Sequence, residues 1–303
     1  MNANERLQNH PYGSFIRDVE KPARYVGGEY QSVEKPRESV DVSICLAFPD
    51  IYDIGMSHLG TKLLYKIINK EPNFAAERVF APWIDMAAEL RKRDLPLLSL
   101  ETARPLKEFD VLGFSLQYEM TFTNVLNMID LAQMPVRACD RDDSHPLIIA
   151  GGPTATHPEP IAPFLDALLI GDAEEKLPEA LRAIAVWKKK GLSRHDMLRG
   201  LASLGGWYCP ALYEMKDDPV SGFQVIDEER SKGPYPVTRA WVEDLNAYPF
   251  PDDSPIAAAE AIFDRMSIEI ARGCTEGCRF CQAGMIYRPV RERDPDDVVQ
   301  ALL

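Results

Sequence analysis

The sequence lacks long apolar runs, an export signal and a surplus of positive charge. A representative apolar stretch, residues 161–170, is interrupted by Pro163 and Asp166 and is shorter than the roughly 18 residues that a membrane helix requires. Residues 1–10 are polar and contain no apolar core of a signal peptide. The formal net charge of −13 argues against a general phosphate-binding surface, so charge does not indicate nucleic acid as a partner. These absences predict a cytoplasmic protein that does not engage a membrane.

Cysteine is also scarce, and its six copies are unevenly placed. Three of them fall within residues 274–281. The other three are scattered, at Cys45, Cys139 and Cys209. This distribution is not that of a secreted disulfide framework. We expect the scattered cysteines to be buried and unreactive.

The central part of the chain alternates short apolar runs with amphipathic stretches. Buried strands are predicted at 43–48, 78–80, 110–115, 147–150 and 167–170. Helices are predicted after Ser57 as N-cap and at 84–92, 121–131 and 174–189. Strands that alternate with helices predict an α/β fold with a doubly wound parallel sheet.

Unusual residues follow several of the predicted strands. Ser115 ends one strand, Gly151 and Gly152 end the next, and residues 171–175 follow the last. Paired glycines let the backbone approach a ligand closely, and a helix N-terminus beside them can receive a phosphate. Each of these sites is also compatible with simple turn chemistry.

Beyond Gly191 the pattern changes to a short helix at 192–204 and two strands, 207–214 and 222–226, that we expect to form a hairpin. A proline-rich linker follows, with Pro234, Pro236, Pro249, Pro251 and Pro255. Proline fixes φ, so this linker is predicted to be semi-rigid. Asp294 as N-cap and Pro295 at the first helical position predict a final helix.

Three cysteines in the spacing C-x3-C-x2-C, Cys274, Cys278 and Cys281, follow an apolar run at 266–270 that we expect to be a strand. Soft thiolates select zinc, copper(I) or iron–sulfur centres, and a closed zinc site needs a fourth nitrogen or sulfur ligand. His145, His157 and His195 lie far upstream. A three-cysteine site with one open metal position is therefore the favoured interpretation.

These residues resemble the signature of the radical S-adenosylmethionine (SAM) superfamily. The pattern C-x3-C-x-aromatic-C is matched by the three cysteines together with Phe280, and Arg272-Gly273 before it is also similar to that family. The resemblance implies a [4Fe–4S] cluster in which three of the four irons are bound by Cys274, Cys278 and Cys281. It implies SAM on the fourth iron with Phe280 at the cofactor site, a TIM-like barrel, and a reductant such as flavodoxin or ferredoxin. The substrate is unknown.

The preceding region resembles the cobalamin-binding-like domain that often accompanies a radical SAM domain. In that resemblance Ser115, Gly151 and Gly152 line the slot for the nucleotide tail of cobalamin. The sequence departs from the cobalt-ligating D-x-H-x-x-G pattern, because Asp53 and His58 have the wrong spacing. His58 is therefore expected to cap or pack rather than bind metal.

The resulting organisation has four parts. We predict an N-terminal extension at 1–40, a cobalamin-binding-like α/β domain at 41–191, a connector at 192–250, and the incomplete start of a radical SAM core at 251–303. The chain is thus expected to be the N-terminal portion of a radical SAM enzyme. Two alternatives are a corrinoid or nucleotide binding module without catalysis, and a structural protein stapled by zinc.

Overall fold

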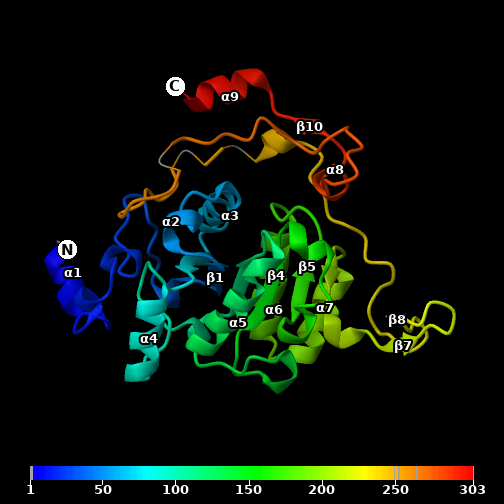
Figure 1. Cartoon of the computed structure of the whole chain (residues 1–303), viewed down its shortest axis with the longest axis horizontal. Helices are drawn as coiled ribbons and strands as arrows, with labels where there is room; N and C mark the ends of the chain where they lie inside the picture. Colours follow the sequence, from blue (N-terminus) through cyan, green and yellow to red (C-terminus); the bar gives the residue numbers. More distant parts are fainter. Residues whose placement is uncertain (1–2, 249, 252, 264, 303) are drawn as a thin grey trace.

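The computed structural model describes residues 3–248, 250–251, 253–263 and 265–302 (Figure 1). Pro249 of the predicted linker and Leu303 of the predicted final helix lie outside the described residues. No helix in the described part of the chain is long and apolar enough to cross a membrane.

A six-stranded sheet with the order β2-β1-β3-β4-β5-β6 forms the centre of the molecule. Its strands are β1 Val42–Phe48, β2 Phe74–Phe80, β3 Val111–Ser115, β4 Leu147–Gly151, β5 Ala167–Leu169 and β6 Trp207–Tyr208. The first five are parallel and β6 is antiparallel. The order 2-1-3-4-5 is that of flavodoxin-like folds, whose ligands bind where the strand order reverses, between β1 and β3. The predicted α/β fold with a mostly parallel sheet is confirmed.

Helices cover both faces of this sheet (Figure 1). One face packs against α3 Leu59–Lys70, α6 Lys176–Lys189 and α7 Arg194–Ser203. The other packs against α4 Ile84–Arg93, α5 Phe122–Leu131 and apolar side chains of residues 12–25. Two short helices, α1 Ala3–Asn9 and α2 Tyr52–Gly55, precede α3. Because α3 and α5 leave β1 and β3 toward opposite faces, the sheet edge is open between them.

The N-terminal segment packs on this body through residues 12–25. Tyr25 is buried, and Gly27 and Gly28 turn the chain with positive φ. Arg24 and Lys21 donate to the Asp53 carboxylate at 2.6 and 2.9 Å. Tyr30 further along is 73% exposed, and its backbone forms a bridge to residue 256.

Strand β2 begins at Phe74, before the strand predicted at 78–80, because Glu77 interrupts the apolar pattern and is nevertheless buried. Arg78 donates through Nε to Glu101 at 2.7 Å, and Glu77 accepts from the Ser99 hydroxyl at 2.6 Å. Buried charges are tolerated where they are paired and hydrogen-bonded. These partners lie in the loop after α4, so the sequence near Glu77 contained no local signal that residues 74–77 belong to a buried strand.

The predicted hairpin of 207–214 with 222–226 is wrong in its pairing. Trp207 and Tyr208 instead form β6, which pairs with β5 in the main sheet. The hairpin consists of β7 Met215–Asp217 and β8 Gln224–Ile226. Pairing with β5 buries Trp207, which is 1% exposed, and an exposed hairpin would leave that large indole in water.

The C-terminal segment passes over the carboxyl ends of the parallel strands (Figure 1). It contains β9 Ala271–Arg272, α8 Ala283–Ile286, β10 Arg291–Glu292 and α9 Pro295–Leu302. The strand predicted at 266–270 is displaced to β9, which pairs antiparallel with β10. The predicted helix start is confirmed, since the Asp294 carboxylate accepts from the Asp296 backbone amide at 2.8 Å.

Candidate functional site

A cavity of about 460 Å³ opens at the carboxyl ends of the parallel strands and extends between the sheet and helices α3 and α6. Ser115, Gly151 and Gly152, the residues predicted to line a cofactor slot, all border it. Apolar side chains form its deeper walls: Leu46, Leu63, Ile149, Leu169, Leu177 and Trp207. We call this cavity the slot. Its position beside the β1/β3 reversal is where flavodoxin-like folds place ligands.

Two glycines give the slot its shape. Gly113 lies within β3, and a Cβ there would stand only 3.1 Å from the Ile44 Cδ1 atom, so the Ile44 side chain packs directly against the strand backbone at this point. Gly152 has φ of +109°, and a Cβ there would lie 2.4 Å from the Leu116 carbonyl oxygen. Only glycine adopts this conformation without strain. The tight turn brings the backbone after β4 against the mouth of the slot.

His58 lies in the wall of the slot as the N-cap of α3, the position that the sequence assigned to Ser57. Its Nδ1 accepts from the Thr61 backbone amide at 3.1 Å, and its ring lies 4.9 Å from the Phe48 ring. Burial lowers the pKa of His58 to about 4, against a smaller opposing effect of its hydrogen bond with Gln117. The predicted capping role is confirmed.

Arg272 fastens the C-terminal segment over the slot. Its guanidinium lies 2.6 Å from the Glu174 carboxylate, 3.1 Å from that of Asp172 and 2.8 Å from that of Glu269. Burial alone would lower the pKa of Arg272, but the hydrogen bonds and charges of Glu269 and Glu174 raise it overall. Asp172 and Glu174, which lie in the turn after β5, thus anchor the segment that carries the cysteines.

Two further arginines complete this attachment. Arg291 donates to Asp172 at 2.5 Å and to the Val242 carbonyl oxygen at 2.5 Å. Arg293 donates to the carbonyl oxygens of Leu245 and Tyr248 at 2.6 and 2.9 Å. The linker, the β9–β10 pair and the turn after β5 are therefore held together by side chains that were not singled out in the sequence.

The three clustered cysteines lie on the loop after β9. Cys274 is half-buried, whereas Cys278 and Cys281 are exposed, and all three are free thiols. Gly273 starts the loop with φ of +101°, and a Cβ there would lie 2.7 Å from the Tyr287 and Pro289 carbonyl oxygens. Within the described residues no group of three or more His, Cys, Asp or Glu side chains is assembled to bind a metal.

The donor set nevertheless fits an iron–sulfur cluster, because three thiols on one short loop can be drawn to one centre and soft thiolates are its ligands. A second cavity of about 580 Å³ is bordered by Cys278 and Cys281 and, from the α/β domain, by Thr156 and His157. The fold therefore brings His157 to the cysteine loop. Phe280 is 91% exposed and borders neither cavity.

The scattered cysteines divide into two kinds. Cys45 and Cys209 are buried as expected, and burial raises the pKa of Cys209 to about 12. Cys139 is exposed, so its predicted burial is wrong. It lies in a one-turn 3-10 helix, Ala138–Asp140, between α5 and β4, none of whose residues is buried.

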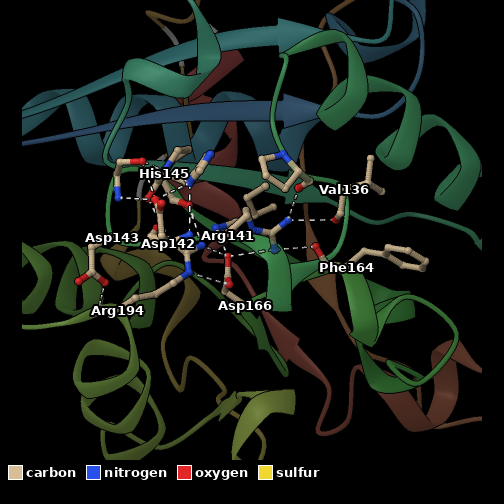
Figure 2. Close-up of polar contacts among 12 residues, drawn as sticks. Val136, Arg141, Asp142, Asp143, His145, Phe164, Asp166 and Arg194 are labelled. Atoms are coloured by element: carbon tan, nitrogen blue, oxygen red, sulfur yellow. Dashed lines mark hydrogen bonds and ion pairs between the residues drawn. The ribbon is translucent and has the colours of Figure 1, made fainter.

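A separate buried polar cluster lies at the opposite end of the strands (Figure 2). The Asp166 carboxylate accepts from Arg194 at 2.5 Å, from Arg141 at 3.3 Å and from the Ile148 backbone amide at 2.7 Å. Arg194 also donates to the His145 carbonyl oxygen at 3.0 Å. These contacts fix α7 and the loop before β4 to the sheet, so His145 belongs to a structural cluster.

Parts of this chain are similar in sequence to known proteins. Residues 60–210 match a family model described as radical SAM proteins, N-terminal. An uncharacterized protein of Methanocaldococcus jannaschii is 22% identical over 258 residues, which are 85% of this chain and 44% of that protein. A solved radical SAM methyltransferase, TsrM from Kitasatospora setae with tryptophan and a SAM analogue bound, superposes with a TM-score of 0.44 at 14% identity, over 86% of this chain and 44% of that one.

The chain thus spans less than half the length of the curated relative it matches. The family match covers the parallel strands β2 to β5, the helices between them and β6, which form the slot-bearing part of the structure. The chain is accordingly a radical SAM superfamily protein that carries the N-terminal domain of that family.

Proposed function

We propose that this chain is the N-terminal portion of a radical SAM enzyme in which Cys274, Cys278 and Cys281 bind three irons of a [4Fe–4S] cluster. When bound and reduced, such a cluster supplies the electron that cleaves SAM at its open iron. The observation that carries the proposal is the attachment of a three-thiol loop, through Arg272, to the strand-end edge where α/β folds bind ligands.

The residues of the chain have defined tasks in this proposal. Gly273 permits the turn that starts the cysteine loop, and Arg272 holds β9 on Asp172 and Glu174. The exposure of Cys278 and Cys281 leaves them accessible for cluster assembly. Phe280, being exposed, is available to cover a bound cofactor. Flavodoxin or ferredoxin is the proposed reductant, and the cytoplasm the proposed location.

A second candidate function, corrinoid binding, is favoured by the slot. Its apolar depth, together with Ser115, Gly151 and Gly152 at the mouth, fits the aromatic nucleotide tail of cobalamin. His58 is not expected to ligate cobalt, because its spacing from Asp53 departs from the D-x-H-x-x-G pattern and its ring, the cap of α3, is packed on Phe48. Cobalamin bound here is therefore expected to show the absorption spectrum of cobalt without a histidine ligand.

Iron and sulfide analysis tests the main proposal. Anaerobic reconstitution should yield about four irons and four sulfides per chain, and Cys274→Ala, Cys278→Ala and Cys281→Ala should each abolish the cluster absorption. Cys139→Ala is the matched control, because this thiol is also exposed but lies outside the loop. Normal cluster content in any of the three loop variants, or one zinc without sulfide, would contradict the proposal.

A further inference from the structure

We infer that Cys278 and Cys281 form a reversible disulfide with each other when no metal is bound, with oxidised glutathione or a similar carboxylate-bearing disulfide as the oxidant. The cysteine loop then has a second chemical state, in which both of its exposed thiols are withdrawn from metal binding. The disulfide itself does not depend on the proposed function, whereas its consequence for cluster assembly rests on that function.

The backbone brings these two cysteines together in one turn. The Cys281 amide donates to the Cys278 carbonyl oxygen at 3.2 Å, across the turn residues Arg279 and Phe280. The end residues of such a turn have Cα atoms less than about 7 Å apart. A disulfide usually joins Cα atoms that are about 4.4–6.8 Å apart. The pair can therefore close with little movement of the backbone.

Cys274 is placed differently from the other two cysteines of the loop. It is half-buried, and its Sγ accepts from the Glu276 backbone amide at 3.4 Å. Cys278 and Cys281 are exposed and line the second cavity, and Cys274 is not among the described residues that line it. Because thiols that react with small disulfides have to be accessible, exchange is favoured at Cys278 and Cys281.

The cavity beside these two thiols is cationic, although the chain has a formal net charge of −13. It is lined by three arginines, Arg239, Arg279 and Arg288. Glu276 is the one acidic residue among the described residues that line it. In the described part of the chain none of the three guanidinium groups is paired with a carboxylate, and Arg239 donates to backbone carbonyl oxygens. Oxidised glutathione is an anion at neutral pH, so the cavity attracts it.

The exchange is balanced by the reduction of glutathione. One loop thiolate attacks a sulfur of oxidised glutathione, which forms a mixed disulfide and releases one glutathione thiolate. The other loop thiolate attacks the loop sulfur of the mixed disulfide, and the second glutathione thiolate leaves. The loop thiols are oxidised to the disulfide, and their protons end on the two reduced glutathione molecules. A dithiol reverses both steps.

The disulfide state would control the loading of metal. It leaves Cys274 as the single thiol of the loop, and one thiolate cannot hold the three irons that the proposed function assigns to the loop. Cluster assembly on this chain therefore requires that the turn first be reduced.

Peptide mapping of the cluster-free chain tests the pairing. Trypsin cleaves after Arg279 and separates the two cysteines into peptides 273–279 and 280–291. After anaerobic treatment with oxidised glutathione, a disulfide should link these peptides, and dithiothreitol should remove the link. Alkylation before digestion should label Cys274 and leave Cys278 unlabelled. The opposite labelling, a bond within peptide 273–279, or no loop disulfide at all would overturn the inference.

Two variants accompany this measurement. Cys274→Ser should keep the link, because this thiol takes no part in it, and loss of the link would contradict the pairing. Cys139→Ser is the control, because this thiol is exposed but lies outside the loop, and the link should form in it as in the wild-type chain.

The charge of the cavity provides a second test. Arg288→Gln should slow disulfide formation by oxidised glutathione roughly three-fold, and it should not slow the reaction with cystamine, a cationic disulfide. Arg199→Gln, an exposed arginine of α7 that does not line the cavity, is the control and should change neither rate. Equal slowing with both reagents, or none with glutathione, would overturn the assignment of the oxidant.

Cluster assembly is measured separately on the same samples. Iron and sulfide added without a dithiol should give little cluster on the oxidised chain, and assembly should follow the addition of dithiothreitol. Equal assembly on the oxidised and the reduced chain would overturn the control of metal loading. If neither chain assembles a cluster, the proposed function fails while the peptide link still stands, so the two failures are distinguishable.

Discussion

The Arg272 side chain connects the strand-end turn of the α/β domain to the loop that carries the cysteines. It is 14% exposed and contacts Asp172, Glu174 and Glu269. Removing one partner of a buried ion pair leaves uncompensated charge. We predict that Arg272→Leu speeds amide hydrogen exchange in residues 269–274 and 291–293 roughly ten-fold or more, with little change in β1.

Arg182→Leu is the matched control for this measurement. Arg182 pairs with Glu71 at 2.9 Å, but both side chains are largely exposed. Such surface pairs contribute about 0–1 kcal/mol. Exchange in residues 269–274 that is as slow in Arg272→Leu as in the control would show that the ion pairs do not hold the loop.

His58 should make the stability of the chain depend on pH. Its pKa is lowered to about 4 in the folded state from about 6.5 when unfolded, so the unfolded chain binds the proton more strongly. The contribution is fully present above about pH 6.5 and is lost as the pH falls toward 4. His58→Asn keeps a capping side chain without titrating there. Urea unfolding at several pH values should therefore show a shallower loss of stability in the variant, by about 1–3 kcal/mol.

An identical pH dependence in the two proteins would contradict this assignment. The carboxylates that also titrate in this range are common to both, so the difference between the two proteins isolates His58. His10, whose pKa burial likewise lowers to about 4, is unchanged in the variant.

Single residues were predictable where their chemistry is local. Ser115, Gly151 and Gly152 meet at one cavity because each directly ends a strand of a parallel sheet. Trp207 was missed as a wall residue, because its place in β6 depends on pairing with β5. The N-cap was assigned to Ser57 on residue preference, whereas the backbone places His58 there.

At the scale of elements, the turn between β4 and the next segment depends on Gly152. Gly152→Ala would force a side chain onto a backbone with positive φ and within 2.4 Å of the Leu116 carbonyl oxygen. We predict a loss of about 1–3 kcal/mol in the free energy of unfolding, measured by urea denaturation. Gly191→Ala is the control, since it also has positive φ but nothing within 4 Å of the added atom. An equal cost for both would show that the close approach is unimportant.

Elements were predictable when periodic apolar patterns sufficed. The helices α4, α5 and α7 begin and end near the predicted residues, because each carries one apolar face and α7 has Ser193 as its cap. Residues 74–77 of β2 were not predictable, since the buried Glu77 finds its partner Ser99 only in the loop after α4. The strand predicted at 266–270 is replaced by the short strand β9, which the ion pairs of Arg272 hold in place.

At the scale of the whole molecule, the strand order and the course of the C-terminal segment create the candidate site together. The slot opens at the β1/β3 reversal, and residues of the C-terminal segment, Arg272 and Gly273 among them, form part of its wall. The sequence predicted the parallel sheet and the cysteine loop separately. It contained no local signal for their contact, because that contact joins residues about a hundred positions apart, such as Glu174 and Arg272.

The chain as it stands is predicted to bind a cluster but to cleave SAM poorly. In TIM-like barrels, ligands are held by loops from several strands, and among the described residues of this chain the strand that leads into the cysteine loop is β9. With dithionite and SAM supplied to the reconstituted chain, we expect less than about one 5′-deoxyadenosine per cluster. Multiple turnovers per cluster would refute the requirement for further barrel strands.

Iron lability is the most direct test of the central claim that three cysteines hold a cluster with one open iron. After anaerobic reconstitution, mild oxidation should release one iron and give the EPR signal of a [3Fe–4S] cluster, because that iron has no protein thiolate. Addition of ⁵⁷Fe(II) and reductant should then return a single labelled iron, visible by Mössbauer spectroscopy. A four-iron cluster that keeps all its irons, or a zinc site without sulfide, would contradict the account.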